Sequence, residues 1–244
     1  MDLIVIGGGC YGCYHTRQLL KAQRRGKIAA RRFLLVDHNP ACRALAEFAD
    51  EPLVEVVRAD WSDFLRDRLA GMDAATADRL VPAPFAPHLL FEWLLDVVGA
   101  AVPEAGVTRG HCDLALGLPY EHGDALGNRF ISAAGWICPA TCIEPARCPA
   151  IRAERTWELG DIVRVGIERA SLAAAAHPYS GVELFTCHHY AYGIGTIPVA
   201  EILGARDRLV AALRREPGQA QRLVVGTVSA CHGVLGELVS RPAD

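Results

Sequence analysis

Short hydrophobic runs alternate with longer amphipathic segments in the first third of the chain. Residues 2–6, 32–37 and 54–58 consist mainly of Val, Ile, Leu and Phe, in runs as long as a buried strand. Residues 13–22 lie between the first two runs and are expected to form a helix. This strand–helix–strand order predicts parallel strands joined by a helical crossover.

The same alternation continues to the end of the chain and favours one sheet over two independent domains. We therefore predict an α/β fold with a doubly wound, mostly parallel sheet, formed by residues 1–244 as a single domain. Helices are expected over 88–98, 157–176, 197–215 and 233–240, and strands over 112–117, 181–187 and 222–231. The parts of this domain are a first half at 1–82, an irregular loop rich in Cys, Pro and Gly at 121–150, and a C-terminal α/β half at 151–244.

A glycine-rich turn follows the first hydrophobic run. Gly7, Gly9 and Gly12 have the spacing G-x-G-x-x-G, and Cys10 and Tyr11 lie between the second and third glycines. In such a turn the first glycine permits the sharp bend, the second lets a diphosphate approach the backbone, and the third lets the helix pack closely on the strand. The sequence therefore predicts a phosphate-binding turn at the helix N-terminus.

The second hydrophobic run ends in an acid, Asp37. An acid at this place in a dinucleotide-binding fold accepts hydrogen bonds from the hydroxyls of the adenosine ribose. Because a carboxylate repels a 2′-phosphate, Asp37 favours NAD over NADP. FAD is a further alternative, since the same glycine-rich opening is common in flavoproteins.

With these motifs, residues 2 to about 82 resemble a Rossmann NAD(P)-binding domain, closest to the compact TrkA-N type. In that type an acid near the adenine ends a later strand, and Asp60 in the segment Val-Arg-Ala-Asp-Trp-Ser-Asp matches it. The resemblance implies cofactor binding by Gly7, Gly9, Cys10, Tyr11, Gly12, Asp37 and Asp60. It covers about a third of the chain and implies no particular reaction.

Three cysteines lie close together in the irregular loop. Cys138, Cys142 and Cys148 fall within eleven residues, and two of them precede proline. Cys187, at the end of a predicted strand, is the fourth ligand that we select, with Cys231 and Cys112 as alternatives. The spacing matches neither the standard ferredoxin motifs nor the paired cysteines of a zinc ribbon. An iron–sulfur cluster, zinc, redox chemistry of the thiols and simple packing all stay open.

Three side chains are candidates for proton transfer. His188 and His189 directly follow the strand predicted at 181–187, and Tyr120 follows a Gly-Leu-Pro turn. Ligands bind beyond the carboxyl ends of parallel strands, and histidine has a pKa near neutral pH. We therefore select His188, His189 and Tyr120 as catalytic candidates, with Glu144 as a further base or supporting residue.

The overall composition narrows the function classes. The formal net charge is −3, without a long basic block, so nucleic-acid binding has little electrostatic support. No apolar segment is long enough for a membrane span, and the N-terminus lacks the basic leader of a signal peptide, so we expect a cytoplasmic protein. Its expected partners are a small-molecule substrate or a redox partner protein, with a homodimer as a further expectation.

Two functions fit these observations. The first is an NAD(P)-dependent oxidoreductase acting on a small substrate that the sequence does not identify. The alternative is a nucleotide-binding redox sensor or metal-centre assembly protein, with zinc or an iron–sulfur cluster in the loop Cys138–Cys148. A small flavoprotein is a third, weaker interpretation.

Overall fold

The computed structural model describes residues 1–84, 86–139, 142–173, 178–216 and 218–241. Its internal contacts divide the chain into two compact units. Unit 1 comprises Met1–Leu89, Pro139–Ile143 and Cys187–Leu203, and unit 2 comprises Leu90–Cys138, Glu144–Thr186 and Gly204–Asp244. The expectation of a single α/β domain over residues 1–244 stays a prediction.

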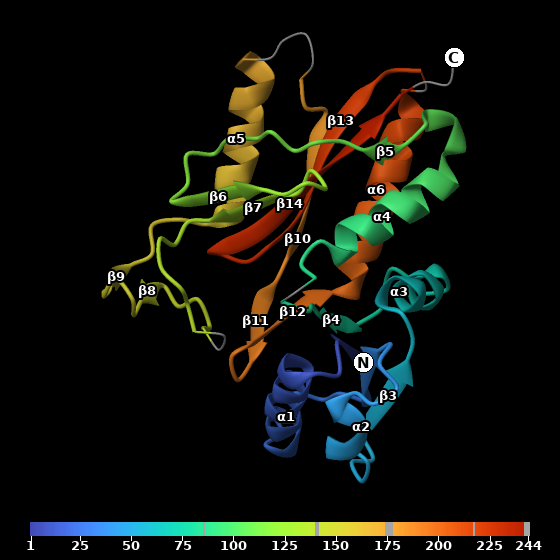
Figure 1. Ribbon diagram of the computed structural model, residues 1–244, viewed down its shortest axis with the longest axis vertical. Helices are drawn as coiled ribbons and strands as arrows, with labels where there is room; N and C mark the ends of the chain where they lie inside the picture. The colour runs from blue at the N-terminus through green and yellow to red at the C-terminus, as the bar shows by residue number, and fades with distance from the viewer. Residues whose placement is uncertain (85, 140–141, 174–177, 217, 242–244) are drawn as a thin grey trace. The chain divides into compact units, whose positions relative to one another are not determined.

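Unit 1 contains a sheet with the strand order β11-β12-β4-β1-β2-β3 (Figure 1). Its strands are β1 (Asp2–Ile6), β2 (Arg32–Asp37), β3 (Val54–Arg58), β4 (Arg79–Val81), β11 (His188–Ala191) and β12 (Ile194–Pro198). The first four are parallel neighbours in the order β4-β1-β2-β3, whereas β12 joins β4 antiparallel. The hydrophobic runs of the sequence thus form adjacent parallel strands.

The helices of unit 1 connect these strands in chain order. They are α1 (Cys10–Arg24), α2 (Arg43–Glu47) and α3 (Trp61–Ala70). An ion-pair cluster joins α1 to α2, because Glu47 pairs with Arg17 and, at 2.7 Å, with Arg43. The buried side chains of β1 and β2, including Leu3, Val5, Phe33 and Leu35, form the core together with Leu19 and Leu20 of α1.

The segment from Tyr190 to Thr196, which precedes the helix expected over 197–215, forms most of the β11–β12 hairpin. Arg79 of β4 fixes this hairpin to the sheet. Its Nε donates to Thr196 Oγ1 at 2.7 Å, and its guanidinium lies 4.7 Å from the centre of the Tyr190 ring. The hairpin thus adds two strands beyond β4, next to the parallel part of the sheet.

Unit 2 contains a second sheet, with the order β10-β13-β14-β7-β6 and with β5 also paired to β14. Its strands are β5 (Thr108–Arg109), β6 (Tyr120–Gly123), β7 (Arg129–Ser132), β10 (Gly181–Thr186), β13 (Gln221–Val228) and β14 (His232–Ser240). Only the β10–β13 pair is parallel among these pairings of described residues. A separate two-stranded ladder joins β8 (Arg147–Cys148) and β9 (Ala153–Glu154). The protein is therefore α/β with sheets of mixed orientation, and the single mostly parallel sheet expected from the sequence is not what the structure contains.

Helices cover both faces of the unit 2 sheet (Figure 1). They include α4 (Leu89–Ala101), the short 3₁₀ helix η1 (Pro103–Ala105), α5 (Leu159–Ala173) and α6 (Val199–Arg215). Leu235 packs in the cluster that contains Leu159 and Val163 of α5, whereas a Cβ on Gly236 would lie 2.8 Å from the Phe91 ring of α4. Because neighbouring strand residues point to opposite faces, α4 and α5 cover opposite faces of β14.

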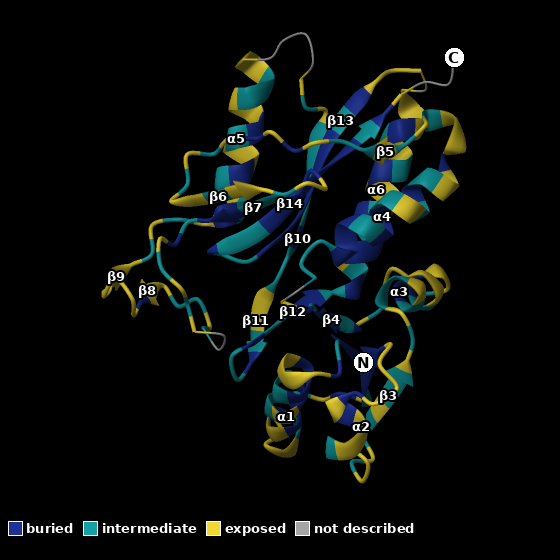
Figure 2. Ribbon diagram, in the orientation of Figure 1, coloured by how far each residue is buried: buried dark blue, intermediate teal, exposed yellow. Residues whose placement is uncertain are grey.

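Two element predictions in unit 2 are wrong. Residues 233–240 form the central strand β14 rather than a helix, and Figure 2 shows this strand largely buried. Residues 112–117 form no strand, and Glu121 accepts the backbone N–H groups of Leu116 and Leu118 instead. The region 121–150, expected to be irregular, contains most of the β6–β7 hairpin and strand β8.

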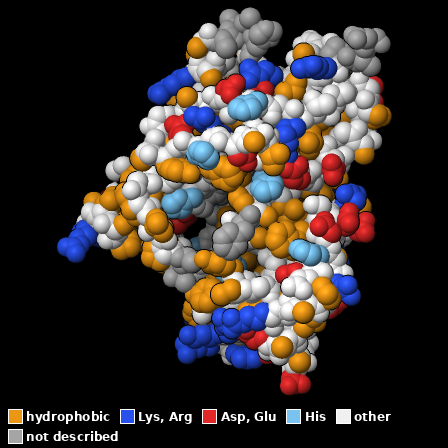
Figure 3. All heavy atoms as spheres, in the orientation of Figure 1, with side chains coloured by type: hydrophobic (Ala, Val, Ile, Leu, Met, Phe, Trp, Pro, Cys, Tyr) orange, Lys and Arg blue, Asp and Glu red, His pale blue; other side chains and the backbone are white. Residues whose placement is uncertain are grey.

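Charged side chains of both signs are spread over the face seen in Figure 3, with hydrophobic side chains between them. Within the described residues, none of the helices has the length and apolar character needed to cross a bilayer. The expectation that the chain has no membrane span is consistent with this finding.

Candidate nucleotide-binding site

The turn after β1 requires glycine at its first position. Gly7 has a φ of +91°, a conformation that side chains with a Cβ rarely adopt. Its N–H donates to the carbonyl oxygen of Val36 at 2.8 Å, which fixes the turn to the neighbouring strand β2. The indole of Trp61 borders the same place, since a Cβ on Gly7 would lie 3.6 Å from Trp61 Cζ2.

Gly12 permits α1 to start directly against the turn. A Cβ at this position would lie 1.7 Å from the carbonyl oxygen of Gly7, which is closer than atoms can approach. Gly9 is the N-cap of α1 with φ −84°, and no side chain caps the helix there. A Cβ on Gly9 would meet nothing within 4 Å, so the turn is open at the residue that precedes α1. Helix N-termini attract anions through their backbone N–H groups and dipole.

The peptide at Gly8, in contrast, is held from several sides. Its N–H donates to Asp37 Oδ2 at 2.7 Å, and its carbonyl oxygen accepts the N–H of Ala44 at 3.0 Å. The Cys13 thiol donates to the same carbonyl oxygen at 3.5 Å. Because burial raises the pKa of Cys13 to about 11, the thiol stays protonated and neutral. A Cβ on Gly8 would lie 2.8 Å from Cys42 Sγ. This edge of the turn is therefore closed by the protein itself.

Asp37 faces the glycine turn from the end of β2. Besides accepting from Gly8, its carboxylate accepts the N–H of Asn39 at 2.8 Å, and the residue is 9% exposed. An ionised carboxylate has about four acceptor positions, so these two bonds leave capacity for hydroxyl donors. Its role in fixing Gly8 was not predicted from the sequence, because it depends on the pairing of β2 with β1.

The other residues assigned to the cofactor have varied surroundings. Asp60 is the N-cap of α3 and accepts the N–H groups of Ser62 and Asp63 at 2.8 and 3.3 Å, which accounts for an acid at this position. Cys10 is exposed in the first turn of α1, and Tyr11 is 38% exposed beside it. The contact of Asp60 with adenine stays a prediction.

The catalytic candidates belong to different units. His188 and His189 lie in β11 of unit 1, and His189 Nε2 accepts the N–H of Gly193 at 3.1 Å. Tyr120 begins β6 of unit 2 and is 52% exposed. The structure therefore supplies no shared geometry for these three side chains, and their catalytic role stays a prediction.

The cysteines selected as metal ligands form no ligand group in the part of the chain that the structure describes. No cluster of three or more His, Cys, Asp or Glu residues there is arranged to hold a metal ion. Cys148 is buried in β8, and Cys187 packs against Gly195, where a Cβ would lie 2.6 Å from its Sγ. Cys138 and Cys142 are half-buried. A zinc or iron–sulfur site in this loop thus gains no support from the geometry.

Sequence reasoning missed a polar cluster at the β13–β14 turn in unit 2. The Glu144 carboxylate accepts the Ser229 hydroxyl at 2.6 Å and the N–H of Ala230 at 2.9 Å. Nearby, His232 Nδ1 lies 3.0 Å from Ser132 Oγ, and burial lowers the pKa of His232 although Glu144 raises it. The nearest signal in the sequence was the isolated acid between two cysteines, whose partner lies 85 residues away.

Comparison with known proteins assigns the C-terminal part of the chain to a family. Residues 90–240 match the AF_1314_C family, described as "Uncharacterized protein, C-terminal domain". The match covers more than half of the chain, and the chain belongs to this family. No curated protein and no solved structure matches the chain significantly.

Proposed function

We propose that unit 1 binds a dinucleotide, with NAD favoured, at the turn Gly7–Gly12, and that the protein is an oxidoreductase that uses it. The observation that carries the proposal is the contrast within the turn. Gly12 is closed against Gly7 and Gly8 is held from several sides, whereas Gly9 faces open space before a helix of 15 residues that no side chain caps.

The surrounding sheet supports this assignment. The order β3-β2-β1-β4 of its parallel strands matches the first four strands of the dinucleotide-binding arrangement, which has the order 3-2-1-4-5-6. In that arrangement the diphosphate lies at the N-terminus of the first helix, which corresponds to Gly9, Cys10 and Tyr11 here. The residues of the turn thus fit the group that the fold implies.

Asp37 supports the choice of NAD over NADP. Its carboxylate lies at the carboxyl end of β2 and faces the turn, where a ribose would follow the diphosphate. A ribose hydroxyl can donate to a remaining acceptor position of Asp37, whereas a 2′-phosphate would bring a second negative charge to a buried carboxylate. A bound nicotinamide would supply hydride transfer, and His188, His189 and Tyr120 stay our candidates for the accompanying proton.

The experiment compares two glycine variants. Gly9→Val adds a side chain into open space at a φ of −84°, so we expect an unchanged fold and at least a tenfold loss of NAD affinity, measured by isothermal titration calorimetry. Gly71→Val is the matched control, because a Cβ at Gly71 also meets nothing within 4 Å. Retained affinity in a folded Gly9→Val variant would contradict the proposal, as would equal loss in both variants.

A further inference from the structure

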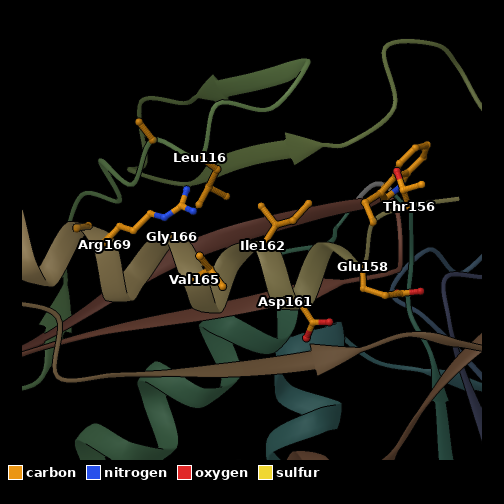
Figure 4. A pocket seen from close by; sticks show the side chains of 11 residues that line it. Leu116, Thr156, Glu158, Asp161, Ile162, Val165, Gly166 and Arg169 are labelled. Atoms are coloured by element: carbon orange, nitrogen blue, oxygen red, sulfur yellow. The ribbon is translucent and has the colours of Figure 1, made fainter.

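The outward face of α5 in unit 2 carries a shallow groove of about 580 Å³ (Figure 4). Residues of α5 at helical spacing form its floor, and Leu116 and Trp157 border it. Leu116 is seated tightly, since a Cβ on Gly166 would lie 2.2 Å from Leu116 Cδ2. The Glu121 carboxylate also accepts the N–H of Leu116 at 3.1 Å. The groove wall at Leu116 is therefore fixed by packing and by a hydrogen bond within unit 2.

Hydrophobic side chains remain exposed along this face. Val165 is 43% exposed in the middle of the helix, and Leu172 is 84% exposed near its end. The buried face of α5 is separate and consists of Leu159, Val163 and Ile167. Val165 lines the groove, and exposed hydrophobic residues that gather on one face mark an interaction surface more often than isolated ones do.

The charges on this face are arranged symmetrically about Val165. Asp161 precedes it by four residues and Arg169 follows it by four, and both line the groove. Neither residue has an ion pair within the described parts of the chain. Figure 4 shows Arg169 and Asp161 on opposite sides of Val165 along the helix. A twofold rotation about an axis through Val165 therefore places each charge near the position of its opposite.

We propose that this face binds the same face of a second copy of the chain, with the two α5 helices antiparallel. Val165 meets its counterpart at the axis, and Asp161 pairs with the partner's Arg169 on each side. Each charge lies about 6 Å along the helix from Val165, because the rise is about 1.5 Å per residue. A self-complementary patch of this kind closes into a twofold dimer. The proposal is independent of nucleotide binding.

Charge reversal tests the pairing directly. Asp161→Arg and Arg169→Asp each place like charges together across the axis, so we expect each to weaken the dimer at least tenfold in sedimentation equilibrium. The double variant exchanges the two charges and restores both pairs, so its dimerisation constant should return to within about threefold of the wild type. Raising the salt concentration should weaken the wild-type dimer.

Two exposed residues on other helices serve as controls. Asp67→Arg in α3 and Arg215→Asp in α6 make the same charge changes away from α5 and should leave the dimer unchanged. Circular dichroism establishes that each variant is folded. A wild-type chain that stays monomeric at every concentration accessible to sedimentation equilibrium overturns the proposal. A dimer that resists both single variants, or single losses that the double variant does not reverse, overturns it equally.

Discussion

At the scale of single residues, Asp2 shows how a charge is accommodated in the core of unit 1. The side chain of Asp2 is fully buried, and its Oδ2 pairs with Arg31, Arg32 and Arg68 at 2.8, 3.0 and 2.9 Å. Burial alone would raise its pKa, but hydrogen bonds from Arg31 and Arg32 outweigh this effect and lower the pKa to about 2. The folded protein therefore favours the ionised form.

This shift predicts a pH dependence of stability. Because the pKa of Asp2 falls from 3.8 when unfolded to about 2 when folded, the ionised carboxylate stabilises the protein above pH 4. That contribution, about 2 kcal/mol, is lost as the pH falls from about 4 to 2, and about half of it is lost by pH 3.

Urea unfolding of the wild type and Asp2→Asn measures this contribution. The difference in unfolding free energy between them should shrink by about 1 kcal/mol between pH 6 and pH 3. Glu55→Gln is the control, because the Glu55 side chain is 54% exposed in its pair with Arg32 and should show little change. A difference that stays constant with pH would contradict the assignment.

At the scale of elements, Glu144 connects the cysteine-containing loop to the β13–β14 turn. Its backbone has a positive φ of 50°, which is uncommon for a residue with a side chain. The conformation is maintained by the bonds that its carboxylate accepts from Ser229 and Ala230. The loop is therefore held at this point by a half-buried carboxylate as well as by packing.

Removing this acceptor should loosen both segments. We expect Glu144→Ala to lower the unfolding free energy by about 2 kcal/mol, since hydrogen bonds to a charged acceptor are lost. Hydrogen exchange should become faster at 144–150 and 229–232. Glu154→Ala, at an exposed position in β9, is the control. Unchanged exchange at 229–232 would mean that the turn keeps its conformation without Glu144.

The elements that were predicted correctly have a simple hydrophobic pattern. The bounds expected for β2 and β3 agree with the structure. β2 is a continuous hydrophobic run between Arg32 and Asp37, and β3 is rich in valine, with Glu55 as its one polar residue before Arg58. The helix predicted over 233–240 is wrong because Gly233 and Gly236 interrupt the strand pattern, and because Glu237 is a charged residue that a strand buried on both faces does not usually contain. In the structure Gly236 accommodates Phe91, and Arg222 pairs with Glu237 at 2.5 Å. These contacts join distant residues and leave no local signal.

At the scale of the whole molecule, the error in β14 also hid the second sheet. Strands β13 and β14 are separated by three residues, which suffices for an antiparallel hairpin but not for the crossover of a parallel pair. Reading both segments as strands would have predicted a sheet of mixed orientation.

The glycines of the candidate site, in contrast, were recognisable from their spacing alone. The bonds of Asp37 and Ala44 to Gly8 were not, since they depend on tertiary structure.

The four tryptophans provide a test of nucleotide binding that separates the two units. Trp61 is in unit 1 and borders Gly7, whereas Trp93, Trp136 and Trp157 are in unit 2. With 5-fluorotryptophan incorporated, ¹⁹F NMR resolves each position, and Trp61→Phe assigns the resonance of unit 1. We expect NAD to shift the Trp61 resonance, because the diphosphate would bind at the turn beside its ring.

In urea the same resonances report the stability of each unit. With NAD at 100 times its dissociation constant, unfolding measured at Trp61 should require about 2.7 kcal/mol more free energy. If NAD raises the unfolding free energy measured at the other three tryptophans by the same amount, the units unfold together and the chain behaves as a single domain. If the unfolding free energy measured at these three tryptophans is unchanged, the units unfold separately and NAD stabilises unit 1 alone. If NAD raises the unfolding free energy at the three tryptophans of unit 2 and leaves the value at Trp61 unchanged, the nucleotide binds outside the glycine turn.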